Sequence, residues 1–189
     1  AGISVTMDVH AAPAGLSLAM VAHPEYDDQY WRYLTDLRGE SATGDVRITR
    51  QDSALWRVEA PPGDLTIHYR VRFPTVPAGQ RLAWKAFLTP NGGLIGGPHS
   101  FLYVVGSEHI PASVTLALPA GWLAATGLTA TDPRSYSAPN IEVLVDSPVL
   151  VGGFRQWQFD VSGVPHRISY LGDPGGVPFD TAALRTGVE

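Results

Sequence analysis

The 189-residue chain has no cysteine and only one lysine, Lys85, and its formal net charge is −5. The lack of cysteine excludes disulfides and thiolate metal sites, but it does not identify the cellular compartment. The absence of a basic stripe argues against a nucleic-acid partner. No apolar run approaches the ~20 residues that a membrane-spanning helix needs. We expect a globular protein without a membrane span, and we slightly favour a periplasmic or secreted location over a cytoplasmic one.

The sequence also lacks the motifs that would make this chain an enzyme by itself. A zinc-binding HExxH helix needs two histidines one turn apart, and none of the six histidines begins such a motif. Ser107, Glu108 and His109 are consecutive, so on a strand they point to opposite faces and form no triad. His99 and His109 flank one predicted strand, and lone strand histidines usually have structural roles. We therefore expect no catalytic residue, metal site or cofactor in this chain.

Glycine, proline and alternating patterns are what the chain does have. Twenty glycines and sixteen prolines separate short segments in which apolar and polar residues alternate, as in half-buried strands joined by turns. The clearest segment, residues 65–73, has apolar side chains on one face and Thr66, His68, Arg70 and Arg72 on the other. That polar face is either ordinary surface or a docking face. Together, these short alternating segments and turns predict a mainly β fold, either an antiparallel β-sandwich or a saddle-like sheet.

One segment, near residues 24–38, predicts an amphipathic helix. Pro24 would occupy the first helical position, acidic residues follow it, and Gly39 comes after the last predicted turn. The aromatic residues of the segment fall at helical spacing. This spacing favours an amphipathic helix that packs on the sheet. The less favoured alternative is an aromatic platform for sugar or peptide.

The rest of the chain is organised around residues 141–161, in which Asp146, Ser147 and Pro148 separate the first two apolar runs. An aspartate carboxylate accepts hydrogen bonds from nearby backbone N–H groups, and proline fixes its own φ, so these residues are typical of a turn. The pattern predicts a strand, a sharp corner, a short strand and a glycine bend. We expect Asp146 to cap the corner, because no second metal or substrate ligand lies near it in the sequence.

Strict alternation returns in residues 155–161, directly after the glycine bend. This period of two predicts a half-buried strand. The apolar side of the strand carries Trp157, Phe159 and Val161, and the polar side carries Gln156, Gln158 and Asp160. We predict that Trp157 and Phe159 are core residues and not a ligand platform.

Three segments, residues 91–105, 114–122 and 141–166, resemble a known family. The first holds Asn91-Gly92 before an apolar strand, and the second closes in a Pro-x-Gly-Trp corner. The third holds the signature residues Leu144, Val145, Asp146, Ser147, Pro148 and Gly152. Together they resemble the N-terminal domain of the glycyl aminopeptidase family (metallopeptidase family 61). Its members are zinc peptidases with an N-terminal β domain, a thermolysin-like catalytic domain and a PDZ domain.

This resemblance implies a non-catalytic N-terminal β domain in residues 1–178 and the start of a linker helix in residues 179–189, capped by Asp180. The partner would be the protein's own catalytic domain, which would hold zinc and cleave the peptide substrate, while this domain helps to shape the cleft. The candidate interdomain face comprises His68, Arg70, Arg72, Phe179 and Leu184. The family's early Trp-x-Pro-Gly-x-Tyr-like turn is replaced here by residues 23–37, which leaves substrate preference open.

A second hypothesis comes from another class of protein. A free-standing β-sandwich module could bind carbohydrate or a protein through exposed aromatic residues such as Trp31, Trp122 or Trp157. An adhesin-like structural domain is a weaker third hypothesis. A downstream reading frame with an HExxH motif would favour the peptidase over both.

Overall fold

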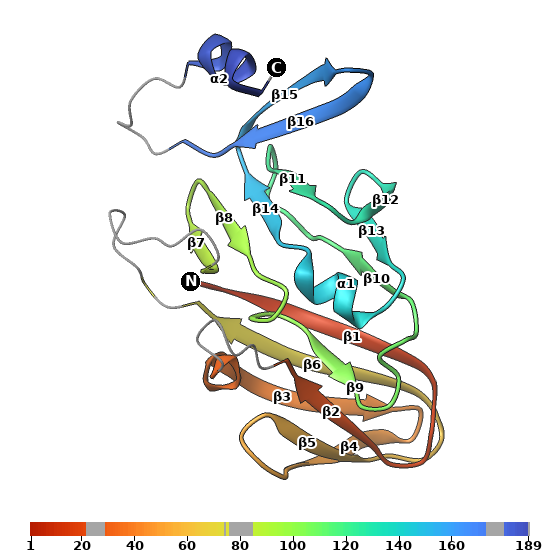
Figure 1. The fold of residues 1–189 in the computed structure, drawn as a ribbon. Helices are drawn as coiled ribbons and strands as arrows, with labels where there is room; N and C mark the ends of the chain where they lie inside the picture. The colour runs from red at the N-terminus through yellow and green to blue at the C-terminus, as the bar shows by residue number, and fades with distance from the viewer. Residues whose placement is uncertain (22–28, 74, 76–84, 173–179, 189) are drawn as a thin grey trace.

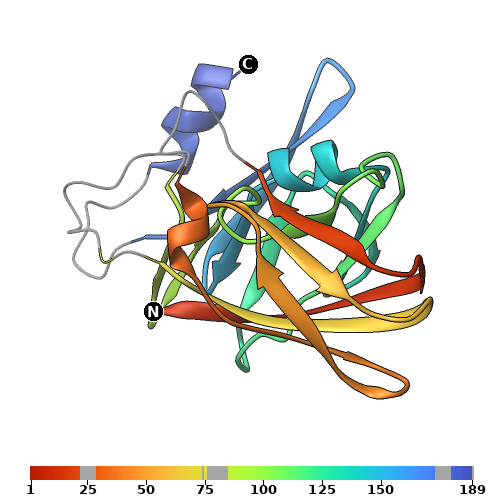
Figure 2. The ribbon, with the colours of Figure 1, turned by 90° about the horizontal axis from the view of Figure 1, so that it is seen from below.

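The computed structural model describes residues 1–21, 29–73, 75, 85–172 and 180–188 (Figure 1). The fold is mainly β, as the alternating patterns predict. The largest sheet has seven strands in the order β1-β6-β3-β4-β5-β2-β9 and curls into a half-barrel (Figures 1 and 2). Its strands are β1 (Gly2–Ala12), β2 (Leu16–Met20), β3 (Leu34–Ser41), β4 (Gly44–Arg50), β5 (Leu55–Glu59), β6 (Gly63–Arg72) and β9 (Leu102–Val104).

Strand β6 confirms the clearest sequence pattern and lies between β1 and β3, antiparallel to both. Its inward residues Leu65, Ile67, Tyr69 and Val71 are buried. Full burial of one such aliphatic side chain contributes about 1.5–3 kcal/mol. A register slip of one residue would bring the polar face of β6 into the core, so this burial fixes the pairing.

The second half of the chain forms two smaller sheets and a short helix, α1 (Ile141–Asp146). The four-stranded sheet has the order β11-β14-β8-β7, and its buried residues share one core with the seven-stranded sheet. Strands β7 and β8 form a hairpin that turns at Pro90 and Asn91, and Gly92 begins β8. The strands are β7 (Phe87–Thr89), β8 (Gly92–Ile95), β11 (Leu123–Thr126) and β14 (Val149–Gly152), with β10 (Ala112–Thr115), β12 (Thr129–Asp132) and β13 (Ser135–Ala138) in a three-stranded sheet.

The predicted amphipathic helix near residues 24–38 is wrong over its second half. Tyr30–Tyr33 forms a single 3₁₀ turn, η1, and strand β3 begins at Leu34. Residues 22–28 lie outside the described residues. Tyr30 is buried in the main core, and β3 pairs with β6. Sheet pairing therefore overrides a local pattern that also satisfies helical spacing.

The predicted strand at residues 141–145 is also wrong, because this apolar run forms helix α1. Asn140 caps it, since its side-chain oxygen accepts a hydrogen bond from the Val143 N–H at 2.9 Å. Leu144 is buried in a second small core with Leu128, Tyr136 and Ala138. A short apolar run does not distinguish a helix from a strand by periodicity alone, and the cap decides it here.

The predicted strand at residues 155–161 is confirmed as β15 (Arg155–Val161), but its aromatic residues are not core residues. Strand β15 pairs with β16 (Val164–Tyr170) in a separate two-stranded sheet. Figures 1 and 2 both show this hairpin projecting from the larger sheets. Trp157 and Phe159 are half-buried and belong to neither core. The alternation therefore predicted the strand correctly, but not the surface that the strand packs against.

Candidate functional site

The signature residues form a corner in which backbones approach closely. Gly152 in β14 lies opposite Gly92 in β8, and both have positive φ, +136° and +146°. A Cβ atom on Gly152 would lie 2.5 Å from both Asn91 O and Gly92 Cα. Glycine is therefore required at position 152 for both backbone conformation and space.

A second close approach joins α1 to the loop after β8. A Cβ atom on Gly97 would lie 2.5 Å from Val145 Cα, on the helix. The resembling segments 91–105 and 141–166 are therefore in direct contact around these glycines. Their sequence motifs describe one structural unit.

Asp146 lies at the end of α1 and does not cap the corner. Its side chain is exposed, and it makes no hydrogen bond or ion pair with the residues that the structure describes. Ser147 forms the C-terminal cap position of the helix, and Pro148 leads into β14. The corner is instead fixed by burial of Leu144 and by the glycine contacts.

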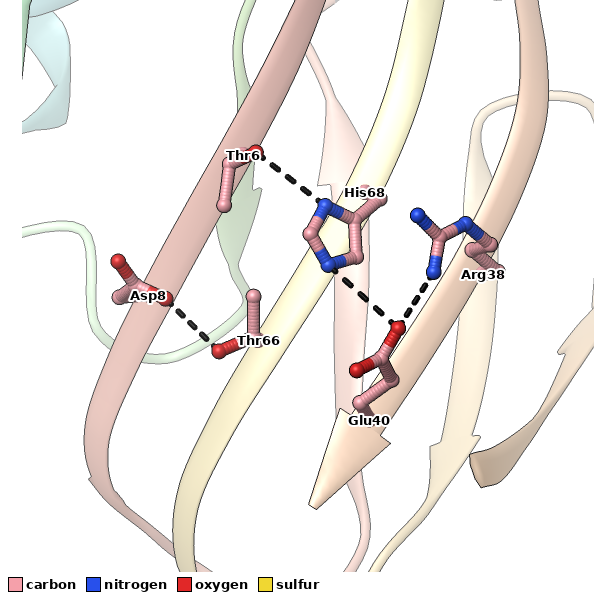
Figure 3. Close-up of polar contacts among 6 residues, drawn as sticks. All are labelled: Thr6, Asp8, Arg38, Glu40, Thr66 and His68. Atoms are coloured by element: carbon pink, nitrogen blue, oxygen red, sulfur yellow. Dashed lines mark hydrogen bonds and ion pairs between the residues drawn. The ribbon is translucent and has the colours of Figure 1, made fainter. Parts of the chain in front are cut away.

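The outer face of β1, β6 and β3 carries a polar network, shown in Figure 3. His68 Nδ1 and Thr6 Oγ1 are 3.2 Å apart, and His68 Nε2 lies 3.7 Å from Glu40 Oε1. Arg38 donates to the same Glu40 oxygen. Thr66 Oγ1 donates to Asp8 Oδ1 at 2.8 Å. His68 is thus held by its neighbours in the sheet, without a partner domain.

Arg70 and Arg72 share this outer face with His68, as the alternation predicts. Both are exposed, and neither forms an ion pair with any other described residue. They are the two cationic groups of the candidate interdomain face.

The other part of the candidate interdomain face is only partly described. Asp180 caps α2 (Thr181–Val188), as predicted, since its carboxylate accepts from the N–H groups of Ala182 and Ala183 at 2.9 and 3.0 Å. Phe179 lies outside the described residues. Leu184 lies on α2, but its side chain is also outside the description.

The buried hydroxyl of Tyr69 is a structural centre that the sequence analysis missed. It donates to Ser100 O at 3.0 Å and accepts from Leu102 N at 3.2 Å, so it joins β6 to the loop before β9. Burial raises the pKa of Tyr69 well above its usual range. The alternation predicted the burial of Tyr69, but no sequence signal indicates where its hydroxyl points.

His99 and Glu108, whose side chains are of types that can bind metals, make other contacts in the structure. His99 is buried, and its ring centroid lies 3.9 Å from that of Tyr30. Glu108 accepts from the Gly106 N–H at 3.0 Å, and this hydrogen bond lowers the pKa of Glu108. Among the residues that the structure describes, no three His, Cys, Asp or Glu side chains form a group that could hold a metal. No described helix has the length and apolar character to cross a membrane.

Trp31 and Trp122, two of the three tryptophans in the binding-module hypothesis, pack against the protein itself. The Arg50 guanidinium lies 4.7 Å from the Trp31 ring centroid and 5.7 Å from that of Trp56. Trp31 and Trp122 are half-buried and pack against the main core. Contacts within the fold therefore occupy the side chains of Trp31 and Trp122.

Comparison with known proteins identifies the family. The family model for the peptidase M61 N-terminal domain matches residues 2–153. The chain belongs to the peptidase M61 N-terminal domain family. This confirms the resemblance carried by the signature residues around Asp146.

A solved structure extends this comparison beyond residue 153. The aminopeptidase N family protein from Idiomarina loihiensis superposes with a TM-score of 0.84 at 19% sequence identity. The match covers 98% of this chain and 32% of that protein, so the M61 chain spans about a third of its length. At this identity the likeness shows the fold alone. Comparison with curated protein sequences finds no significant match.

Proposed function

We propose that this M61 N-terminal domain packs against the zinc-bearing catalytic domain of a longer peptidase and helps to shape its substrate cleft. The family match over residues 2–153 carries the proposal, together with the absence of an HExxH motif from the sequence. A zinc ion in the catalytic domain would supply activated water for peptide hydrolysis. The contribution of this chain would be a shaped surface.

The candidate interdomain face on β6 suits such a role through its exposed cations. Arg70 and Arg72 are exposed on strand β6, which is paired on both sides, and His68 beside them is held by Thr6 and Glu40. A guanidinium binds carboxylates in a planar, bidentate geometry. We propose that these arginines face carboxylates of the catalytic domain or of an acidic substrate.

Activity of the whole protein and of its parts tests this proposal. The 189-residue chain with added zinc should not cleave glycyl or alanyl anilides above a buffer blank, whereas the longer protein should cleave them in a chelator-sensitive manner. In the longer protein, Arg70→Ser with Arg72→Ser should raise KM severalfold. Arg47→Ser, at an exposed position on β4, is the matched control and should leave KM unchanged.

Two results would overturn the proposal. One is reproducible, chelator-sensitive turnover by the 189-residue chain alone. The other is a longer protein without zinc-dependent peptidase activity. A double arginine variant with the KM of its control would remove β6 from the interface but keep the domain assignment.

A further inference from the structure

The β15–β16 hairpin has one apolar face and one polar face. Residues directly opposite each other in an antiparallel pair share a face, and the register pairs Phe159 with His166 and Val161 with Val164. The apolar hairpin face comprises Trp157, Phe159, Val161, Val164, His166, Ile168 and Tyr170. The opposite face carries Gln156, Gln158, Asp160, Pro165, Arg167 and Ser169.

The apolar hairpin face is incompletely covered. Val164 is 56% exposed, and the other six residues are half-buried. The rings of Phe159 and His166 stack on each other, with centroids 5.8 Å apart. Among the described strands, β15 and β16 pair only with each other. A lone two-stranded hairpin is marginally stable in water, so a partner surface is needed to hold it.

The comparisons indicate which polypeptide supplies that partner. The family model ends at residue 153, and the hairpin begins at Arg155. The fold of the longer Idiomarina protein nevertheless covers 98% of this chain, a share that leaves about four of 189 residues unmatched and so includes the hairpin. The hairpin therefore lies beyond the N-terminal domain as the family defines it, and inside a fold that the longer protein shares.

We propose that the β15–β16 hairpin is the first element of the domain that follows, and that its apolar face packs against an apolar surface of that catalytic domain. This inference rests on the proposed function. It places the domain boundary close to residue 153, with the polar hairpin face towards solvent. The outer face of β6 would then be at most a second, polar contact between the two domains.

Hydrogen exchange tests this docking. Amides of residues 159–168 are measured in the 189-residue chain and in the longer protein, and amides of β6 serve as an internal standard for folding. We expect the hairpin amides to exchange at least about tenfold more slowly in the longer protein. In that protein, Phe159→Asp should remove most of this difference. Gln158→Asp introduces the same charge on the neighbouring, polar face and should retain it.

Two outcomes would overturn the inference. Equal hairpin exchange in the two proteins would show that the catalytic domain does not cover this face. Protection that appears in the 189-residue chain alone, rises with its concentration and is lost in Phe159→Asp would assign the face to a second copy. Neither readout depends on peptidase activity. A longer protein that protects the hairpin but lacks zinc-dependent activity would refute the proposed function and leave this inference standing.

Discussion

Replacement of Gly152 by alanine is the most direct test of the signature corner. The backbone of Gly152 has φ +136°, and a Cβ atom there would lie 2.5 Å from Asn91 O and from Gly92 Cα. Both opposing atoms belong to the backbone of the β7–β8 hairpin, so neither can move aside as a flexible side chain can. Alanine would therefore have to separate β14 from β8.

The expected destabilisation has two parts. A non-glycine residue held at such a φ costs about 1–3 kcal/mol, and overpacking a filled site costs about 1–3 kcal/mol more. The sum, roughly 2–6 kcal/mol, is a large share of the ~5–15 kcal/mol that stabilises a typical domain. For a chain of this length the corresponding fall in Tm is roughly 4–24 °C.

Gly153→Ala supplies the matched control for this prediction. A Cβ atom at position 153 meets nothing within 4 Å, φ is not positive, and the Gly153 N–H bond to Asn91 O is kept. The free energy of unfolding should change by less than about 1 kcal/mol. Urea and thermal unfolding of the two variants give the comparison. If Gly152→Ala were within 1 kcal/mol of Gly153→Ala, the close approach would not stabilise this corner.

Two further substitutions test the buried and exposed polar groups. Tyr69→Phe leaves Ser100 O and Leu102 N without their buried partner and should lower the free energy of unfolding by about 1–3 kcal/mol. Burial raises the folded-state pKa of Tyr69, so the contribution of Tyr69 to folding stability is full below the unfolded-state pKa of about 10 and is lost at higher pH. The stability difference between the wild-type protein and Tyr69→Phe should therefore be smaller above pH 10 than at neutral pH. An equal difference at both pH values would contradict this. Glu40→Gln on the exposed network should change the free energy of unfolding by less than about 1 kcal/mol, because exposed ion pairs contribute little. A loss as large as that of Tyr69→Phe would contradict this.

The sequence predicted the strands better than their surroundings. Residues 65–73 and 155–161 alternate equally well, and both form strands. The first lies in the middle of a sheet over the core, whereas the second forms an isolated hairpin. A period of two indicates which side chains share a face, but the face's partner depends on contacts distant in sequence.

The two errors in local structure have a related cause. Residues 30–38 have helical spacing and form a 3₁₀ turn and strand β3, because pairing with β6 outweighs propensity. The apolar run of residues 141–145 predicts a strand but forms helix α1, because the Asn140 cap satisfies the Val143 N–H. In both places a short apolar pattern fits either structure, and a single partner decides between them.

The segments that resemble the family lie in the second half of the chain, at residues 91–105, 114–122 and 141–166. The two halves of the fold place different demands on the sequence. The second half depends on backbone contacts at Gly92, Gly97 and Gly152, where few other residues fit. Such constraints appear in a sequence as short, recognisable motifs. The seven-stranded sheet needs only apolar residues at alternate positions, which many sequences supply. The residues of its outer face can therefore vary without loss of the fold, whereas those of the signature corner cannot.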